Sequence, residues 1–166
     1  YRREPAQRLC GPWHGERIFS GQIHLGDSEK IEAVIAFCDL RRSSVLAETL
    51  GMERFQLALN DFFSCTAGAI LDNGGEILRF IGDAFLAIFP IQKCHGCVHT
   101  ASQNAFSAVM QARQKLEALN AEREAAGEEV LKAGFGLHIG EVLYGNIGTP
   151  ERLEFTVIGA AANEAA

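Results

Sequence analysis

Asp39 and Asp83 are the residues of this chain whose positions best suit chemistry, because each ends a short apolar run. The runs are Val34–Asp39 and Ile77–Asp83, and one amphipathic helical stretch joins them. A sheet built from both runs can present the two carboxylates at one edge. Mg²⁺ prefers a few carboxylate oxygens together with the phosphates of a nucleotide over a closed protein cage. The pair therefore predicts a divalent-metal site and phosphate chemistry.

Composition narrows the class of protein. A chain of 166 residues that is 48% hydrophobic suits one compact domain with a substantial core. Its formal net charge of -6 argues against nucleic acid as a partner, since broad binding of that kind relies on clustered Lys and Arg. An anionic substrate would therefore need metal here.

Apolar stretches and cysteines bear on the compartment. The longest apolar stretches, such as Ala84–Phe89, are far shorter than the roughly 20 residues needed to cross a bilayer. Nothing in the chain resembles a signal peptide. The 5 cysteines are odd in number, and Cys38 and Cys65 lie in apolar contexts that indicate reduced core thiols. We expect a cytoplasmic protein with no membrane span in this chain.

The stretch Cys94–His99 holds two thiols and two imidazoles in six residues. A closed zinc site generally needs a second cluster of ligands, which the sequence does not offer. We favour a loop and helix start with incidental cysteines. Metal binding and a reactive pair of Cys94 and Cys97 are the alternatives.

The N-terminal part of the sequence reads as an arm followed by a strand-and-helix domain. Residues 1–15 mix Arg, Pro and Gly without periodicity, which indicates a linker from an upstream regulatory domain, and residues 16–166 form the domain. Within it we expect an edge strand over 18–23 and a central strand over Glu32–Cys38. Helical spacing then starts at Ser43, with Gly51 between a short helix and a long one that Asn73-Gly74-Gly75 ends.

The remaining elements complete a layered fold. Gly82-Asp83 predicts a two-residue hairpin between strands 76–81 and 84–89. A long helix is expected over 99–126, and then strands 132–139 and 141–147 around a Gly140-Glu141 turn. The order is βαββαβ with an extra hairpin strand. It predicts an α/β (α+β) sandwich with a ferredoxin-like core and both helices on one sheet face.

Several fragments, in order and spacing over 16–166, resemble the class III adenylate/guanylate cyclase catalytic domain. They are Phe37–Leu40, Gly74–Glu76, Phe80–Asp83, Leu137–Val142, Tyr144–Gly148, Phe155–Gly159 and Asn163–Ala166. The resemblance implies conversion of a nucleoside triphosphate to a 3′,5′-cyclic nucleotide and pyrophosphate. It also implies two Mg²⁺ (or Mn²⁺) ions per active site, held by Asp39, Asp83 and the backbone carbonyl of Leu40.

The resemblance assigns the loop after the first strand to the terminal phosphates. Ser43 or Ser44 would supply a hydroxyl at a helix N-terminus, where either serine could also cap the helix. Arg42 stands where the family usually has Gly: it brings strain if the position needs a positive φ, or a guanidinium for the triphosphate if it does not. Arg152 is a further candidate phosphate contact, against a solvated turn residue.

Base selection in this family falls on the positions of Arg79 and Thr156. A cation that donates to purine N1 fits adenine, because guanine N1 carries a hydrogen. ATP is therefore the expected substrate, although Arg replaces the Lys of many adenylate cyclases. Arg79 could instead reach solvent or pair with Glu76.

Asn163 matches the asparagine that orients the ribose, and with Asp39 and Asp83 it forms the expected catalytic set. It is expected at the start of the last helix. The family's transition-state arginine would fall one residue beyond Ala166, so the domain looks incomplete at its C-terminus. The resemblance further implies a homodimer with shared sites, in which one subunit supplies the aspartates and the other supplies Arg79, Thr156 and Asn163.

Other functions stay open at this point. A catalytically silent, nucleotide-binding or dimerising module is one, and a guanylate cyclase is another. A diguanylate cyclase would carry a Gly-Gly-Asp-Glu-Phe-like turn, whereas this chain has Ile81–Phe85. His138 is expected to serve packing or sheet support rather than acid–base work.

Overall fold

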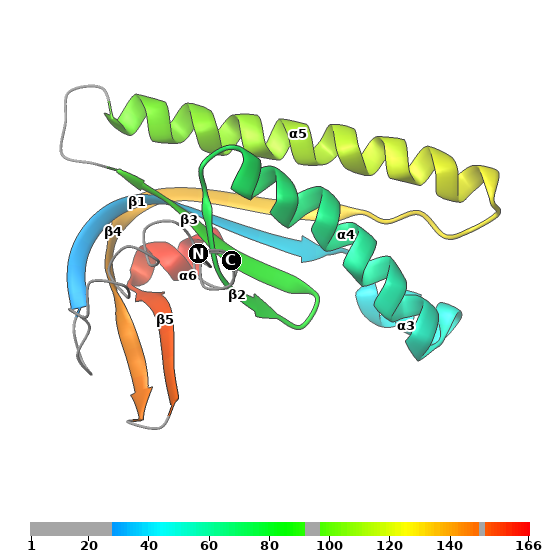
Figure 1. Ribbon diagram of the computed structural model, residues 1–166, viewed down its shortest axis with the longest axis horizontal. Coiled ribbons are helices and arrows are strands. Elements are labelled where there is room, and N and C mark those ends of the chain that lie inside the picture. The colour runs from blue at the N-terminus through cyan, green and yellow to red at the C-terminus, as the bar shows by residue number, and fades with distance from the viewer. Residues whose placement is uncertain (1–27, 92–96, 150–151) are drawn as a thin grey trace, which may run out of the picture.

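The computed structural model describes residues 28–91, 97–149 and 152–166, and Figure 1 shows the arrangement of its elements. The expected edge strand over 18–23 lies outside this part of the chain. The elements are, in order, β1 (Ser28–Leu40), α3 (Ser43–Leu50), α4 (Met52–Asp72), β2 (Glu76–Ile81), β3 (Ala84–Ile91), α5 (Cys97–Ala125), β4 (Ala133–Thr149), β5 (Arg152–Ile158) and α6 (Ala160–Ala165).

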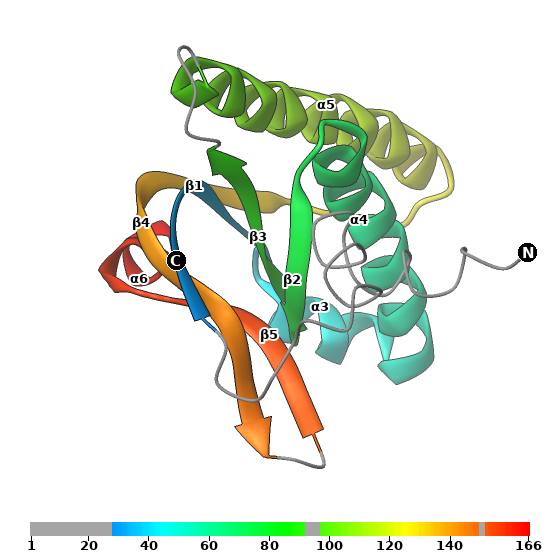
Figure 2. The same cartoon turned by 60° about the vertical axis from the view of Figure 1, so that its left-hand side comes forward.

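The strands form one five-stranded sheet in the order β2-β3-β1-β4-β5, and every neighbouring pair is antiparallel. Without the edge strand β5, the order and connections are those of a ferredoxin-like βαββαβ unit. Helices α4 and α5 lie together on one side of the sheet, and α6 lies on the other side (Figure 2). The predicted fold class is therefore confirmed.

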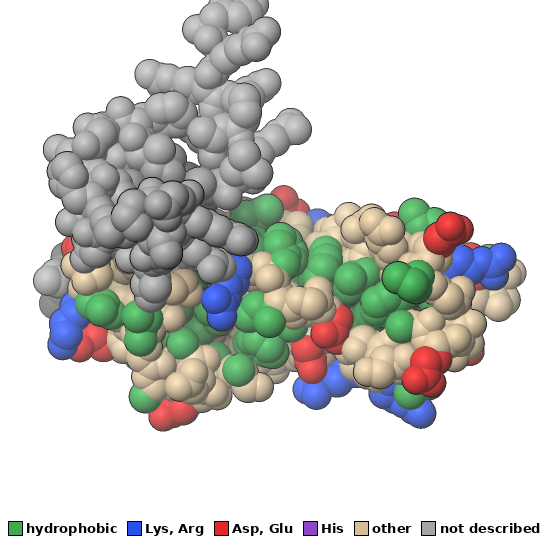
Figure 3. Space-filling model, turned by 90° about the horizontal axis from the view of Figure 1, so that it is seen from below, with side chains coloured by type: hydrophobic (Ala, Val, Ile, Leu, Met, Phe, Trp, Pro, Cys, Tyr) green, Lys and Arg blue, Asp and Glu red, His purple; other side chains and the backbone are tan. Residues whose placement is uncertain are grey.

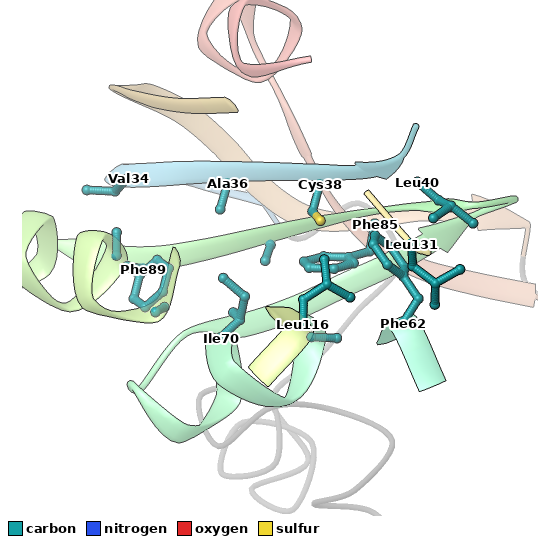
Figure 4. Close-up of a cluster of buried hydrophobic side chains, with 14 of the residues drawn as sticks. Val34, Ala36, Cys38, Leu40, Phe62, Ile70, Phe85, Phe89, Leu116 and Leu131 are labelled. Carbon is teal, nitrogen blue, oxygen red and sulfur yellow. The ribbon is translucent and has the colours of Figure 1, made fainter. Parts of the chain in front are cut away.

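Strand β1 divides its side chains between the two faces, as the two-residue period of a strand requires. Its even-numbered residues from Val34 to Leu40 point into a core beneath α4 and α5, which we call the helix-side core (Figure 4). Large side chains from the helices and β3 fill this core, including Phe62, Ile70, Phe85, Phe89 and Leu116.

The odd-numbered residues of β1 belong to a second cluster, which we call the α6-side cluster. Ala33 and Ile35 are fully buried there, and Phe37 packs against it. Its other buried members are Leu86, Ile88, Val142, Tyr144, Val157, Ala161 and Ala165. The side of the molecule away from α5 exposes hydrophobic side chains between acidic and basic ones (Figure 3).

The helices begin and end near the expected residues. Gly51 separates α3 from α4 with φ 76°, a conformation that favours glycine. At the end of α4, the side-chain amide of Asn73 donates to the carbonyl of Ala69 at 2.8 Å. Lys115 of α5 bonds to Asp72 of α4 at 2.8 Å, which ties the two helices together. Among the described residues, no helix is both long enough and apolar enough to cross a membrane.

The prediction of two strands around a Gly140-Glu141 turn is wrong. Residues Ala133–Thr149 form one continuous strand, in which Gly140 pairs with Ala33 of β1. A Cβ at position 140 would collide with the side chain of Ala161 in α6. Gly140 is small because a helix packs on it, and not because the chain turns there.

Candidate active site

The two aspartates meet where β1 ends beside the β2–β3 turn. Asp39 is the second-last residue of β1 and pairs with Ala84 of β3. Asp83 lies in the turn, and its backbone carbonyl accepts a hydrogen bond from the N–H of Leu40 at 3.1 Å. One backbone hydrogen bond thus links Asp83 to the neighbour of Asp39. The structure brings these two sequence-predicted residues together at one end of the neighbouring strands β1 and β3.

The Asp39 carboxylate lies above a glycine and next to a guanidinium. Gly134 of β4 pairs with Asp39, and a Cβ at position 134 would collide with both Oδ1 of Asp39 and the Arg41 guanidinium. Nε of Arg41 lies 3.4 Å from that Oδ1, and the two side chains are 61% and 31% exposed. Sequence reasoning missed Arg41 and Gly134. Residues two apart in an extended chain share a face, which was the available signal for Arg41.

Arg42 adopts a left-handed conformation, with φ 58° and ψ 32°, at the N-cap of α3. Among the described residues it is the one non-glycine with a positive φ. This answers the question that the sequence left open: the position is one that glycine fits, and arginine strains it. Ser43 and Ser44 are the first residues of α3, so neither is the N-cap, and no side chain makes a cap hydrogen bond. The alternative role of either serine as the N-cap residue is therefore wrong.

A β-bulge sets the direction of Arg79. The pairing of β2 with β3 shifts between Ile77 and Arg79, so that Glu76 pairs with Ile88 and Arg79 pairs with Leu86. The bulge places Glu76 and Arg79 on one face, although an odd spacing would separate them in a regular strand. Arg79 is exposed.

Glu76, which was weighed as a partner for Arg79, is 3% exposed. Its Oε1 accepts a hydrogen bond from the Tyr144 hydroxyl at 2.9 Å. This bond joins β2 to β4 across the α6-side face of the sheet. The sheet is curved, so that its edge strands β2 and β5 also lie near each other. Thr156 of β5 is half-buried and pairs with Gly145.

Asn163 is exposed on α6, as the fourth residue of a helix that begins at Ala160. The helix thus begins three residues before Asn163, so the expectation that Asn163 lies at its start is wrong. Small residues of β4 hold this helix close: a Cβ at Gly136 would collide with the backbone carbonyl of Ala165. Between Gly136 and Gly140 of β4, Nε2 of His138 lies 3.0 Å from Oε2 of Glu164. His138 therefore supports α6 through Glu164, a partner that sequence reasoning missed.

Two sequence-predicted features lie wholly or partly outside the described residues. Arg152 is the first residue of β5 and not a turn residue, and its side chain lies outside the described part of the chain. Cys94 and His95 lie wholly outside the described residues, while Cys97 is disulfide-bonded.

Cys38 and Cys65 are free thiols, as predicted for core residues. Burial raises the pKa of Cys38 to about 12, and a hydrogen bond with Thr66 acts in the opposite direction. A neutral thiol at this position suits packing rather than reaction. Cys38 therefore belongs to the helix-side core and not to the candidate site.

The two carboxylates at the ends of β1 and β3 suit a site for Mg²⁺ better than a closed site made only of protein ligands. Within 28–91, 97–149 and 152–166, no group of three or more His, Cys, Asp and Glu side chains could hold a metal ion. Two carboxylates remain, and Asp39 is partly exposed. A hard cation that completes its shell with water and substrate phosphates suits such a pair.

Comparison with known proteins places this geometry in a family. The profile of the adenylate and guanylate cyclase catalytic domain matches residues 27–166. An adenylate cyclase of Anabaena cylindrica is 33% identical over 147 residues, which cover 86% of this chain and 28% of that protein. Adenylate cyclase 1 of Rhizobium meliloti is 26% identical and covers 81% of this chain and 20% of that protein. The chain thus spans less than a third of the length of these curated relatives.

Solved structures of both substrate classes are similar to this fold. The adenylyl cyclase CyaB from P. aeruginosa has a TM-score of 0.76 and 26% identity, covering 84% of this chain and 71% of that chain. The guanylyl cyclase Cya2 has a TM-score of 0.74 and 28% identity, covering 83% and 68%. The profile match and these likenesses agree with the motifs at the sheet edge. This chain belongs to the family of adenylate and guanylate cyclase catalytic domains.

Proposed function

We propose that this chain is an adenylate cyclase domain that converts ATP to 3′,5′-cyclic AMP and pyrophosphate. The observation that carries the proposal is the meeting of Asp39 and Asp83 across the Leu40 hydrogen bond. In the reaction, the ribose 3′-oxygen bonds to the α-phosphorus as the bond to the pyrophosphate oxygen breaks. The hydroxyl proton passes to water, and the leaving pyrophosphate keeps the electron pair of the broken bond. Similarity to adenylate cyclases at 33% identity supports this reaction class.

Asp39, Asp83 and the backbone carbonyl of Leu40 would hold two Mg²⁺ or Mn²⁺ ions. Bound ions would supply positive charge to the triphosphate and lower the pKa of the 3′-hydroxyl. Asp39 and Asp83 are both half-buried, so part of each residue is accessible to a nucleotide. Asp39 is partly exposed, as a ligand that meets substrate must be.

The N-terminus of α3 would receive the terminal phosphates. Its first residues are Ser43 and Ser44, and no side-chain cap occupies its N–H groups. Backbone N–H groups and the helix dipole at such an end favour anions. A serine hydroxyl there can donate one more hydrogen bond, and Arg42 and Arg152 are further candidate phosphate contacts.

Arg79 and Thr156 would read the base, and Asn163 would orient the ribose. Arg79 donates hydrogen bonds and cannot accept them, which matches the acceptor N1 of adenine and opposes the N1–H of guanine. The bulge in β2 supports this role, because it aims Arg79 away from the helix-side core. The likeness to the guanylyl cyclase Cya2 makes GTP the competing substrate.

We propose that the active form is a cytoplasmic homodimer with two shared sites. Asp39 and Asp83 of one subunit would act with Arg79, Thr156 and Asn163 of the other. A two-fold dimer then contains two equivalent sites without a different partner. Dilution below the dimer dissociation constant should abolish turnover.

The experiment uses the full-length protein with ATP or GTP and either Mg²⁺ or Mn²⁺, and identifies the cyclic product by mass spectrometry. We expect cyclic AMP from ATP, with GTP turned over at least about fivefold more slowly, since a mismatched donor pair costs about 1–3 kcal/mol. Equal or faster turnover of GTP would overturn the base assignment. No cyclic product from either nucleotide would overturn the proposed reaction.

A variant pair tests the base reading directly. Arg79→Lys keeps the positive charge, and Arg79→Glu replaces a donor with an acceptor for guanine N1–H. We expect the lysine variant to keep the preference for ATP and the glutamate variant to lose it. Circular dichroism of both variants checks the fold, and an unchanged preference in Arg79→Glu would remove Arg79 from base selection.

A further inference from the structure

The Asp39 carboxylate already has a cationic neighbour that belongs to the chain itself. Nε of Arg41 lies 3.4 Å from Oδ1 of Asp39, and both groups lie over the bare backbone of Gly134. A side chain at position 134 would displace the two groups together. The guanidinium therefore lies next to one of the two carboxylate oxygens that the proposed metal site could use.

Arg41 can leave this place without a change in the backbone. Its own N–H donates to the carbonyl of Lys132 at 2.8 Å, which fixes the main chain between β1 and α3. Its side chain is 61% exposed and so is free to reach solvent. The fixed backbone and the exposed guanidinium together describe an ion pair that can open by side-chain rotation alone.

We propose that Arg41 is an exchangeable counter-cation for Asp39, which holds the carboxylate over Gly134 until a divalent ion displaces it. This inference rests on the proposed function, because that function makes Asp39 a metal ligand. A divalent ion bound to the Asp39 carboxylate would repel the Arg41 guanidinium beside it, so metal binding favours opening of the pair. Opening this pair opposes metal binding and raises the concentration of metal needed to fill the site.

The size of the effect follows from the exposure of the pair. The loss of an exposed ion pair changes a binding constant by about 1.4-fold to fivefold. Such a penalty is large enough to affect occupancy at limiting Mg²⁺ and small enough to leave binding possible. Because Arg41 is exposed, the penalty should fall as salt screens the charges.

The test measures Mn²⁺ binding to the full-length protein without nucleotide, from the electron paramagnetic resonance signal of free Mn²⁺. Arg41→Met removes the charge and keeps the length of the side chain. Arg41→Lys keeps the charge. Arg113→Met removes the same charge from an exposed site on α5, in the helix layer, and serves as the matched control.

We expect Arg41→Met to bind Mn²⁺ about threefold more tightly than wild type at low ionic strength, and the difference to shrink in about 0.5 M salt. Arg41→Lys should lie between the two, and Arg113→Met should match wild type. Equal or weaker binding by Arg41→Met, while wild type binds, would overturn the role of Arg41 alone. An absence of Mn²⁺ binding by every variant and by wild type would overturn the metal site and the proposed function with it.

Discussion

Cys38 and Asp39 are neighbours on β1, yet they face opposite sides of the sheet and have opposite surroundings. Cys38 is 1% exposed in the helix-side core, where burial raises its pKa to about 12. Asp39 is 31% exposed beside Arg41. The period of a strand alone separates the two, so that one face supplies stability and the other carries charge.

The two faces of the sheet also differ in the size of the residues that pack there. Large rings such as Phe62 and Phe85 interlock under α4 and α5, and both are fully buried. On the other face, α6 packs on the bare backbone of Gly136 and Gly140. Substitutions in the helix-side core should therefore mainly lower the free energy of unfolding, and substitutions under α6 should mainly lower turnover.

The largest effect is expected from the helix-side core. Phe62→Ala should lower the free energy of unfolding by about 3–5 kcal/mol, because it removes a buried ring and leaves a cavity. Urea unfolding measures this directly. The matched control is Phe106→Ala, whose side chain is 62% exposed on α5 and whose loss should cost less than about 0.5 kcal/mol. Similar costs for both variants would contradict the contrast between core and surface.

Under α6, a small change should reduce activity more than stability. Gly136→Ala places a Cβ against the backbone carbonyl of Ala165 and so displaces the helix that carries Asn163. Turnover should fall by about 100-fold, the cost of a misplacement near 1 Å, while the free energy of unfolding falls by about 1–3 kcal/mol. Steady-state kinetics and urea unfolding of the same preparation give both values. Full activity would show that α6 does not position the ribose contact.

The buried thiol should make stability depend on alkaline pH. Because the raised pKa of Cys38 favours the neutral form in the folded state, its contribution is complete below pH 9 and is lost as pH rises from 9 toward about 12. The loss from this group is about 1.4 kcal/mol per pH unit. Urea unfolding at several pH values should give a steeper decline for wild type than for Cys38→Ala. Parallel declines would contradict the burial of this thiol.

The smallest effect is expected at Arg42, in the loop between β1 and α3. Arg42→Gly should raise the free energy of unfolding by about 1 kcal/mol, because a left-handed conformation strains a side chain but not glycine. Arg54→Gly, in the first turns of α4, makes the same replacement in an ordinary helix and should lower it by about 1 kcal/mol. Opposite signs in thermal unfolding would support the strain, and a loss in both variants would argue against it.

Local patterns were enough to predict most of this fold. The change from a two-residue to a helical period at Ser43 and the Gly82-Asp83 hairpin correctly located β1, α3, β2 and β3. The turn predicted at Gly140 was wrong. Gly140 is needed because α6 packs closely on it, and α6 is too far along the sequence for a local pattern to show this.

The candidate site was predictable in its residues but not in its contacts. Strand ends indicated Asp39 and Asp83. The position of the Arg41 guanidinium next to Asp39 depends on Gly134 of β4, which has no side chain and lies about a hundred residues later in the sequence. The same holds for His138, whose partner Glu164 approaches only when α6 folds back on the sheet. Side-chain partners of this kind follow from tertiary packing and not from sequence spacing.

The central claim is that Asp39 and Asp83, at the ends of β1 and β3, together form one metal site. Its most direct test is the rate of cyclic AMP formation by Asp39→Asn, Asp83→Asn and the double variant of the full-length protein, with Asp61→Asn on the exposed face of α4 as control. Each single variant should lose about 100-fold or more in turnover, and the double variant should lose little beyond that, because residues that serve one unit are not additive. Independent, multiplying losses, or full activity in either single variant, would contradict the claim.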